Sequence, residues 1–129
     1  MDMATDALWE TIGLGPAYQA ATGCGTFAVE THTMYVAELR VGEETWAASV
    51  VLDADPKRLH VAHELGRASD DAVSARQELL YLNVDLTTRR VAPWRVETLG
   101  RLMAAREAHA GVRPGWVGRR CAMPGARPG

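Results

Sequence analysis

The chain has 129 residues, of which 47% are hydrophobic and 23% are charged, and its formal net charge is −2. This length predicts one domain with a single core, and the composition excludes a disordered chain. No apolar run approaches the roughly 18 residues of a membrane span, and the N-terminus lacks the basic and apolar regions of a secretion signal. We therefore expect a cytoplasmic protein with no membrane partner. The two cysteines, Cys24 and Cys121, are too few for a disulfide framework or a zinc site, so we interpret them as ordinary thiols.

Charge is distributed unevenly along the chain. Residues 1–88 carry 5 basic and 14 acidic side chains, whereas residues 89–129 carry 9 basic and 2 acidic ones. The basic end either contacts an anionic ligand such as a nucleotide phosphate or forms a solvated helix and tail, and the second interpretation is the simpler. Because the chain as a whole is weakly acidic, we expect no nucleic-acid partner.

Residues 2–14 have the pattern of a helix. Apolar side chains recur at spacings of three to five, at Met3, Ala4, Ala7, Leu8 and Ile12. Trp9 lies off this stripe, so the helix is apolar around most of its girth, which is typical of a helix enclosed by other structure. Gly13, Gly15 and Pro16 are expected to end it.

Four stretches with the composition of strands follow a loop rich in glycine and threonine. They are residues 26–38, 45–52, 58–67 and 73–86. The short connections between them predict an antiparallel meander. A second helix is predicted at residues 96–109 from its apolar spacing. Residues 111–129 hold five glycines and three prolines and are expected to form a loosely attached tail.

Five segments carry a family resemblance through their order and spacing, although none is a strong motif alone. They are residues 2–8 (DMATDAL), 13–18 (GLGPAY), 27–32 (FAVETH), 55–60 (DPKRLH) with His63-Glu64, and 84–85 (VD) with 89–93 (RRVAP). In these segments the chain resembles the acyl-CoA thioesterase-like hotdog proteins. Its closest resemblance is to the group associated with carnitine and betaine degradation.

The resemblance implies an α+β hotdog fold, in which a curved antiparallel sheet wraps a central helix and a C-terminal helix follows. It assigns residues 1–110 to the hotdog domain and residues 111–129 to the tail. Hotdog proteins generally pair into a continuous sheet, so the resemblance also implies a homodimer or homotetramer, with a pantetheine channel between subunits.

One departure from the family concerns the start of the chain. Family members carry a strand and a loop with an Asp, a Gly-His pair and an Asn before the central helix, whereas this sequence begins with that helix under way. We therefore expect the first strand to be missing, through a misplaced or truncated start or through loss. If it is lost, the neighbouring strand gains an unpaired edge, which proteins normally cover or blunt.

Glu30 and His32 are the best acid–base pair in the sequence. They are two residues apart on a predicted strand and therefore share a face, between apolar Ala28 and Met34. A half-buried face would raise the pKa of the Glu30 carboxyl toward neutrality, which suits a base that activates water for thioester hydrolysis. The alternative is a polar pair across strands or at a dimer contact.

The resemblance also suggests where substrate binds. Hotdog enzymes commonly use the N-terminus of the central helix as an oxyanion donor, which corresponds here to residues 2–5 and makes Thr5 a substrate-binding candidate. Asp2 and Asp6 fit helix caps better than donors. Arg89 and Arg90 are the predicted contacts for the phosphates of CoA.

His60 and His63 superficially suggest a metal site. On a strand they point to opposite faces, and the alternation of Leu59, Val61 and Leu65 favours a strand, so we expect no metal here. His63 shares the apolar face and is interpreted as a core histidine.

These observations predict a thioesterase that hydrolyses a short or polar acyl-CoA without a metal or another cofactor. The alternative is a non-catalytic hotdog module that binds acyl-CoA or serves only in assembly. A weaker alternative is the cone-shaped isomerase fold, which usually places more helix before the sheet than this chain has.

Overall fold

The computed structural model describes residues 8–111, 114 and 117. Residues 8–12 are helical, and they are followed by α2 (Pro16–Thr22), β1 (Cys24–Tyr35), β2 (Thr45–Ala54), β3 (Arg58–Arg67), β4 (Val73–Asp85), β5 (Arg90–Val91) and α3 (Val96–Ala108). The predicted α+β order of helix, strands and helix is confirmed. Among the described residues, no helix is long and apolar enough to cross a bilayer.

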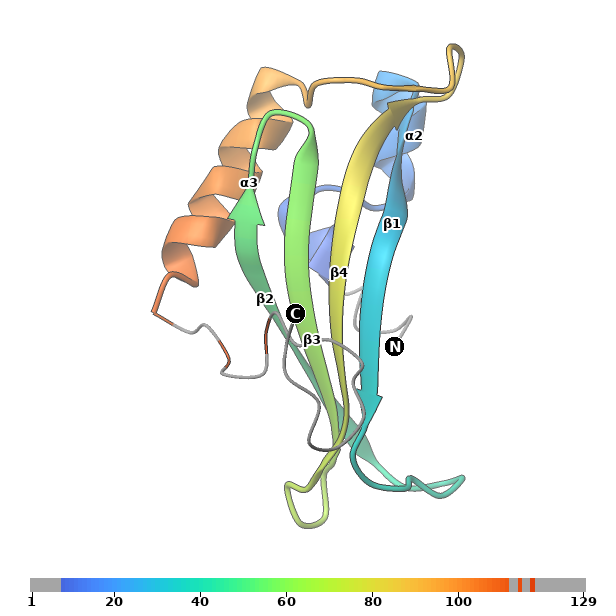
Figure 1. Ribbon diagram of the computed structural model, residues 1–129, viewed down its shortest axis with the longest axis vertical. Helices are drawn as coiled ribbons and strands as arrows, with labels where there is room; N and C mark the ends of the chain where they lie inside the picture. The colour runs from blue at the N-terminus through green and yellow to red at the C-terminus, as the bar shows by residue number, and fades with distance from the viewer. Residues whose placement is uncertain (1–7, 112–113, 115–116, 118–129) are drawn as a thin grey trace, which may run out of the picture.

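The strands form one antiparallel sheet in the order β1-β4-β3-β2, and β5 pairs with the end of β4 (Figure 1). β2, β3 and β4 form the predicted meander. The meander is wrong for β1, which pairs with β4 instead of β2. The reason is the connection over residues 36–44, which is longer than a tight hairpin and allows the chain to cross to the other side of the sheet. β1 and β2 are therefore the two edges of the main sheet.

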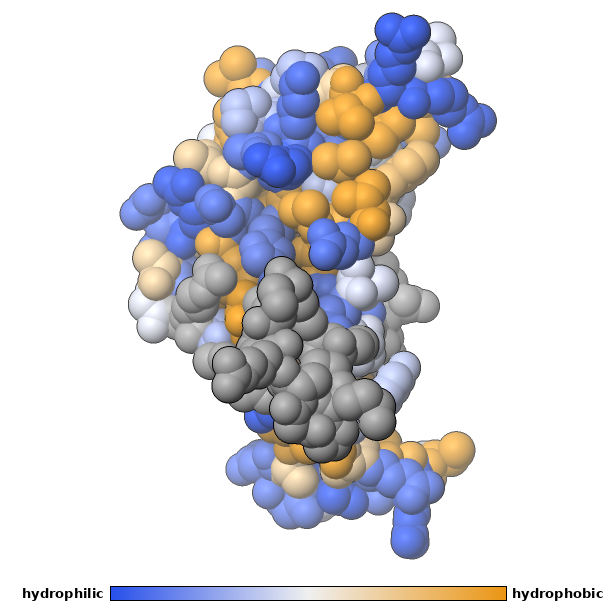
Figure 2. All heavy atoms as spheres, in the orientation of Figure 1, coloured by the Kyte–Doolittle hydropathy of each residue, from blue (hydrophilic) through white to orange (hydrophobic). Residues whose placement is uncertain are grey.

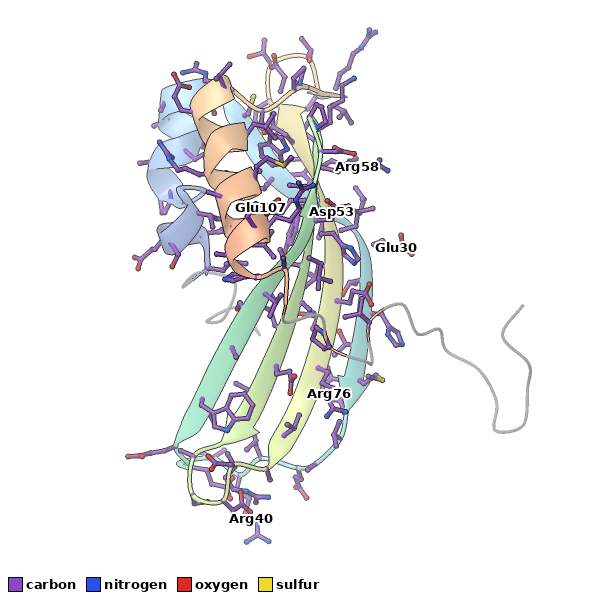
Figure 3. All side chains as sticks on the ribbon, turned by 90° about the vertical axis from the view of Figure 1, so that its left-hand side faces the viewer. Glu30, Arg40, Asp53, Arg58, Arg76 and Glu107 are labelled. Carbon is purple, nitrogen blue, oxygen red and sulfur yellow. The ribbon has the colours of Figure 1, made fainter. Side chains whose placement is uncertain are left out.

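The sheet is long and bent, and the helices cover the upper part of one of its faces (Figure 3). The core lies between that face and the helices, and its buried side chains include Leu8, Ile12, Val61, Leu79 and Leu102. Leu8 is 5% exposed and Ile12 is 2% exposed, so the prediction that the first helix is enclosed holds for its described part. We call the helix-covered side the inner face and the opposite side the outer face.

Two glycines separate the first helix from α2. Gly13 adopts a left-handed conformation with a φ of 78° just after helical residue 12, so the predicted stop is correct. The helix α2, which begins immediately afterwards, was not predicted from the sequence. Pro16 occupies the first turn of α2, where its missing N–H is not needed, and so it starts a helix as well as ending one.

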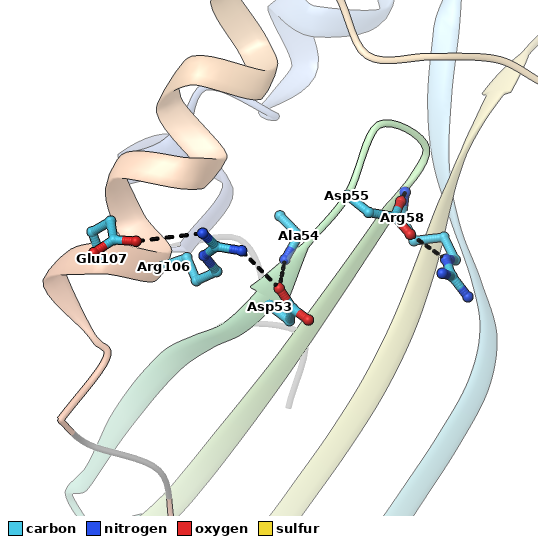
Figure 4. A network of polar contacts seen from close by, with 6 residues as sticks. All are labelled: Asp53, Ala54, Asp55, Arg58, Arg106 and Glu107. Carbon is cyan, nitrogen blue, oxygen red and sulfur yellow. Dashed lines mark hydrogen bonds and ion pairs between the residues drawn. The ribbon is translucent and has the colours of Figure 1, made fainter.

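The edge at β2 is partly covered by α3. The ring Nδ1 of His109, just after α3, accepts a hydrogen bond of 2.9 Å from the backbone N–H of Val51. Arg106 lies 3.2 Å from the Asp53 carboxylate, with Glu107 beside it (Figure 4). Edge strands expose unpaired N–H and C=O groups, so the His109 contact occupies a backbone group that another strand could otherwise pair with.

Candidate functional site

A groove with mixed chemistry lies where the N-terminal helices meet the edge of the sheet. It is a cavity of about 480 Å³, lined on the helix side by Trp9, Glu10 and Tyr18 and on the sheet side by residues 24–27 at the start of β1. Its volume lies within the range of roughly 300–1,000 Å³ that small-molecule sites occupy. Among the strands described here β1 pairs only with β4, so the residues of β1 that line the cavity belong to a strand with one open edge.

The walls of this cavity are held by contacts with the core. The hydroxyl of buried Tyr18 donates a hydrogen bond to the side-chain oxygen of Asn83, and burial raises the pKa of Tyr18 to about 12. The amide nitrogen of Asn83 in turn donates to the carbonyl oxygens of Ala92 at 3.0 Å and Pro93 at 3.2 Å. Asn83 therefore ties α2, β4 and the segment before α3 together, and Tyr18 stays uncharged at neutral pH.

Trp9 is the second fixed aromatic wall. Its ring lies 4.9 Å from the ring of Tyr81 in an edge-on arrangement with an interplanar angle of 66°. This geometry is favourable for an aromatic pair. It holds the indole in place while Trp9 remains only partly buried.

Glu30 and His32 lie on the outer face, away from this cavity. The register pairs them with Leu80 and Glu78 of β4, and Figure 3 shows Glu30 pointing away from the helices. The two residues share a face as predicted. A β-bulge between Ala28 and Glu30 places Ala28 on the inner face, so the expected apolar flank on that side is wrong. Glu30 is also exposed, so the expected half-burial of its carboxyl group is wrong in the single chain.

A hydrogen-bonded pair lies beside His32 on the outer face. The ring Nε2 of His60 is 2.6 Å from the carboxylate of Glu78, the residue opposite His32 in the register. Arg76 of β4 lies 3.8 Å from Glu64 of β3. Both contacts join β3 to β4 across the outer face.

His60 and His63 point to opposite faces, as the alternation predicted. His63 is fully buried on the inner face, and its Nδ1 lies 2.7 Å from the hydroxyl of Ser49. Burial lowers the pKa of His63 to about 4, because the apolar surroundings disfavour the charged ring. The prediction of a core histidine is confirmed by this geometry.

Arg89 and Arg90 are exposed at the end of the sheet that lies near α2. Arg89 sits in the turn after β4 with a φ of 61°, and Arg90 begins β5. The turn is shaped by Asp85, whose carboxylate accepts hydrogen bonds from the backbone N–H groups of Thr87 and Thr88. Nearby, Lys57, Arg58 and Val91 line a cavity of about 340 Å³. Thr5, Asp2 and Asp6 lie outside the described residues.

A family model described as Thioesterase-like superfamily matches residues 1–102 of this chain. The chain belongs to this superfamily. Betainyl-CoA thioesterase from Pseudomonas aeruginosa is 35% identical over 125 residues, which are 96% of this chain and 79% of that protein. L-carnitine dehydrogenase/betainyl-CoA thioesterase from Rhizobium meliloti is 31% identical over 106 residues, which are 82% of this chain and 21% of that longer protein.

Solved structures agree with the superfamily assignment. A structure from Pseudomonas putida, described as a candidate thioesterase, is 36% identical with a TM-score of 0.75 and covers 93% of this chain and 77% of that one. A Staphylococcus aureus protein solved in complex with CoA has a TM-score of 0.84 at 21% identity, covering 93% of this chain and 76% of that one, and it supports the fold alone. The predicted hotdog fold is confirmed.

This cavity was not predicted from the sequence. The position of Trp9 off the apolar stripe of an enclosed helix is the signal that could have led to it. Glu10 and Tyr18 carried no comparable signal, since their approach to the start of β1 depends on the unpredicted α2.

Proposed function

We propose that this chain hydrolyses betainyl-CoA to betaine and CoA. The observation that carries the proposal is the 35% identity to a betainyl-CoA thioesterase over 96% of this chain. Membership of the thioesterase-like superfamily supports the coarser activity, hydrolysis of an acyl-CoA thioester. The cavity beside β1 gives this activity a place to bind a small acyl group.

The reaction needs few groups from the protein. Water adds to the thioester carbonyl carbon and loses a proton to a base, the C–S bond breaks, and the departing CoA sulfur gains a proton. The requirements are therefore a base, a proton donor for sulfur, and N–H groups that stabilise the oxyanion.

Glu30 and His32 stay the predicted base and proton donor. Their support is their adjacency on the outer face of an edge strand. The cavity lies toward the helices, on the other side of β1, so a small acyl group bound there places its carbonyl at the start of β1 and not directly beside this pair. Substitution of Glu30 decides whether the pair acts on it. A Glu30→Gln variant with a kcat lowered at least 100-fold and an unchanged melting temperature supports the assignment. Unchanged activity in that variant removes Glu30 from the mechanism.

Arg89 and Arg90 are proposed contacts for the CoA phosphates. Their exposure and the neighbouring cationic side chains of Lys57 and Arg58 support this role. Replacing both Arg89 and Arg90 with Gln should raise KM for betainyl-CoA by roughly tenfold, equivalent to about 1.4 kcal/mol. Betainyl-pantetheine, which lacks the nucleotide phosphates, is the matched control, and its KM should not change. An equal rise for both substrates contradicts a phosphate contact.

We also propose that the active form is a dimer or a dimer of dimers. β1 is a 12-residue edge strand, and Phe27 and Val29 on it are 43% and 53% exposed. Figure 2 shows apolar surface on the outer face near the same end of the sheet. Long apolar edges are normally covered, and β1 of a second copy could extend the sheet there. Light scattering should give at least twice the mass of one chain, and a monomer at micromolar concentration contradicts this assembly.

A cytoplasmic location is part of the proposal. The free thiol of Cys24 is in keeping with a reducing compartment.

The substrate is tested with a panel of thioesters and the full chain. Betainyl-CoA, carnitine-derived acyl-CoA and straight short-chain acyl-CoA are compared by kcat/KM. The proposal predicts that betainyl-CoA has the highest value. Turnover that is higher with straight-chain esters contradicts betaine as the acyl group but leaves acyl-CoA hydrolysis standing.

A further inference from the structure

The cavity beside β1 has one charged side chain among its described lining residues. That side chain is Glu10, on the exposed side of the first helix. The aromatic side chains of Trp9 and Tyr18 lie on the same helical wall. An anionic group next to two aromatic residues is a combination suited to a cation, because the faces of aromatic rings carry negative potential.

Both aromatic residues are held before any ligand arrives. Trp9 packs edge-on against Tyr81, and the Tyr18 hydroxyl is bound to Asn83. Side chains that are already fixed lose little freedom on binding, so their contribution to affinity is not offset by ordering.

The chemistry of the wall distinguishes between kinds of cation. A divalent metal ion requires several oxygen ligands, whereas this wall offers one carboxylate among aromatic and apolar side chains such as Leu14 and Pro16. A purely apolar acyl chain would cover the Glu10 carboxylate without replacing its water, which is unfavourable. A quaternary ammonium group is suited both to the apolar side chains and to the Glu10 carboxylate. Its methyl groups contact the apolar side chains, and its positive charge lies beside the carboxylate.

We propose that this cavity binds the quaternary ammonium group of the acyl moiety, with Trp9, Tyr18 and Glu10 as its specificity-determining residues. The inference rests on the proposed function, because a betainyl thioester places a trimethylammonium group two bonds from the thioester carbonyl. It predicts that this chain distinguishes between two acyl groups of the same shape by their charge.

The test compares betainyl-CoA with 3,3-dimethylbutyryl-CoA. The second ester replaces the ammonium nitrogen with carbon, so the two acyl groups have the same shape and differ in charge. The wild-type chain should prefer betainyl-CoA in kcat/KM. Glu10→Gln and Trp9→Leu should each reduce that preference by roughly 3- to 30-fold, the range expected for one lost cation contact.

Two controls separate recognition from folding. Glu97→Gln removes an exposed carboxylate from the first turn of α3 and should leave the ratio of the two kcat/KM values unchanged. Loss of packing in Trp9→Leu lowers kcat/KM for both esters, so the ratio still reports the ammonium contact. If Trp9→Leu does not fold, the exposed Glu10→Gln variant decides alone.

The outcomes distinguish this inference from the proposed function. Equal kcat/KM for the two esters in the wild-type chain overturns the ammonium site while thioesterase activity stands. The site is also overturned if Glu97→Gln changes the ratio of the two kcat/KM values as much as Glu10→Gln does. If neither ester is cleaved, the proposed function fails, and calorimetric binding of the same two esters decides the inference. Tighter binding of betainyl-CoA that is lost in Glu10→Gln supports it, and equal binding overturns it.

Discussion

Acidification from pH 7 to pH 4 should destabilise this fold through one buried histidine. The His63 ring is fully buried beside Ser49, and its pKa falls to about 4 in the folded chain from an ordinary value of 6.5. In the unfolded chain the ring is protonated below pH 6.5, whereas in the folded chain it stays neutral until about pH 4. The stability that neutral His63 allows is therefore complete above pH 6.5 and is lost as the pH falls from there toward 4.

The size of the effect follows from the two pKa values. Each pKa unit corresponds to about 1.4 kcal/mol, so this histidine should cost about 2 kcal/mol of unfolding free energy at pH 5 and about 3 kcal/mol at pH 4. Urea unfolding, followed by tryptophan fluorescence, measures that free energy at each pH. His63→Gln keeps a polar side chain beside Ser49 but does not titrate, so it serves as the matched reference.

The difference between the two chains isolates His63 from the carboxylates, which titrate in both. The wild-type chain should lose about 2 kcal/mol more than His63→Gln between pH 7 and pH 5. Parallel losses in the two chains would refute a buried, neutral imidazole.

Two further predictions concern stability at neutral pH. A Cβ added at Gly66 would lie 2.2 Å from the Trp46 ring, so Gly66→Ala should lower the unfolding free energy by about 1–3 kcal/mol. A Cβ added at Gly100 in α3 meets no atom within 4 Å, so Gly100→Ala should raise the unfolding free energy by about 1 kcal/mol. Equal melting temperatures for these two variants would contradict the close packing at Gly66. Asn83→Ala leaves the buried Tyr18 hydroxyl without its acceptor and should cost about 2–4 kcal/mol in urea unfolding; a loss below 1 kcal/mol would show that Asn83 does not join the elements around it.

Most of the helices and strands could be predicted because each depends on the spacing of side chains within its own stretch of sequence. The strand over residues 58–67 has the same bounds in the structure as in the prediction, and the helix predicted at 96–109 ends one residue earlier. Alternation along the chain also placed His60 and His63 on opposite faces. These features depend on side-chain spacing, which the sequence displays directly.

The wrong predictions concern either contacts between residues far apart in the sequence or places where the alternation of side chains along a strand is interrupted. The pairing of β1 with β4 depends on where a nine-residue connection leads, and spacing within a strand does not reveal that. The bulge next to Val29 adds one residue and reverses the faces on either side of it, so period-two counting from Ala28 to Glu30 fails. Pro16 was interpreted only as a helix stop, and the start of α2 was missed for that reason.

The same distinction applies to the site. The shared face of Glu30 and His32 could be predicted from sequence because they are two residues apart on one strand, and their catalytic role stays a prediction. Trp9, Glu10 and Tyr18 meet the start of β1 only through the turn at Gly13 and the packing of α2. A cavity built by several elements has no signature at one spacing, so it required the structure.

Simultaneous measurement of betaine and free CoA released from betainyl-CoA by the full chain decides whether this protein is a betainyl-CoA thioesterase. We expect the two products in equal amounts, at a rate proportional to protein concentration and well above spontaneous hydrolysis. Binding of betainyl-CoA with no release of either product would contradict it and would favour a module that only binds acyl-CoA.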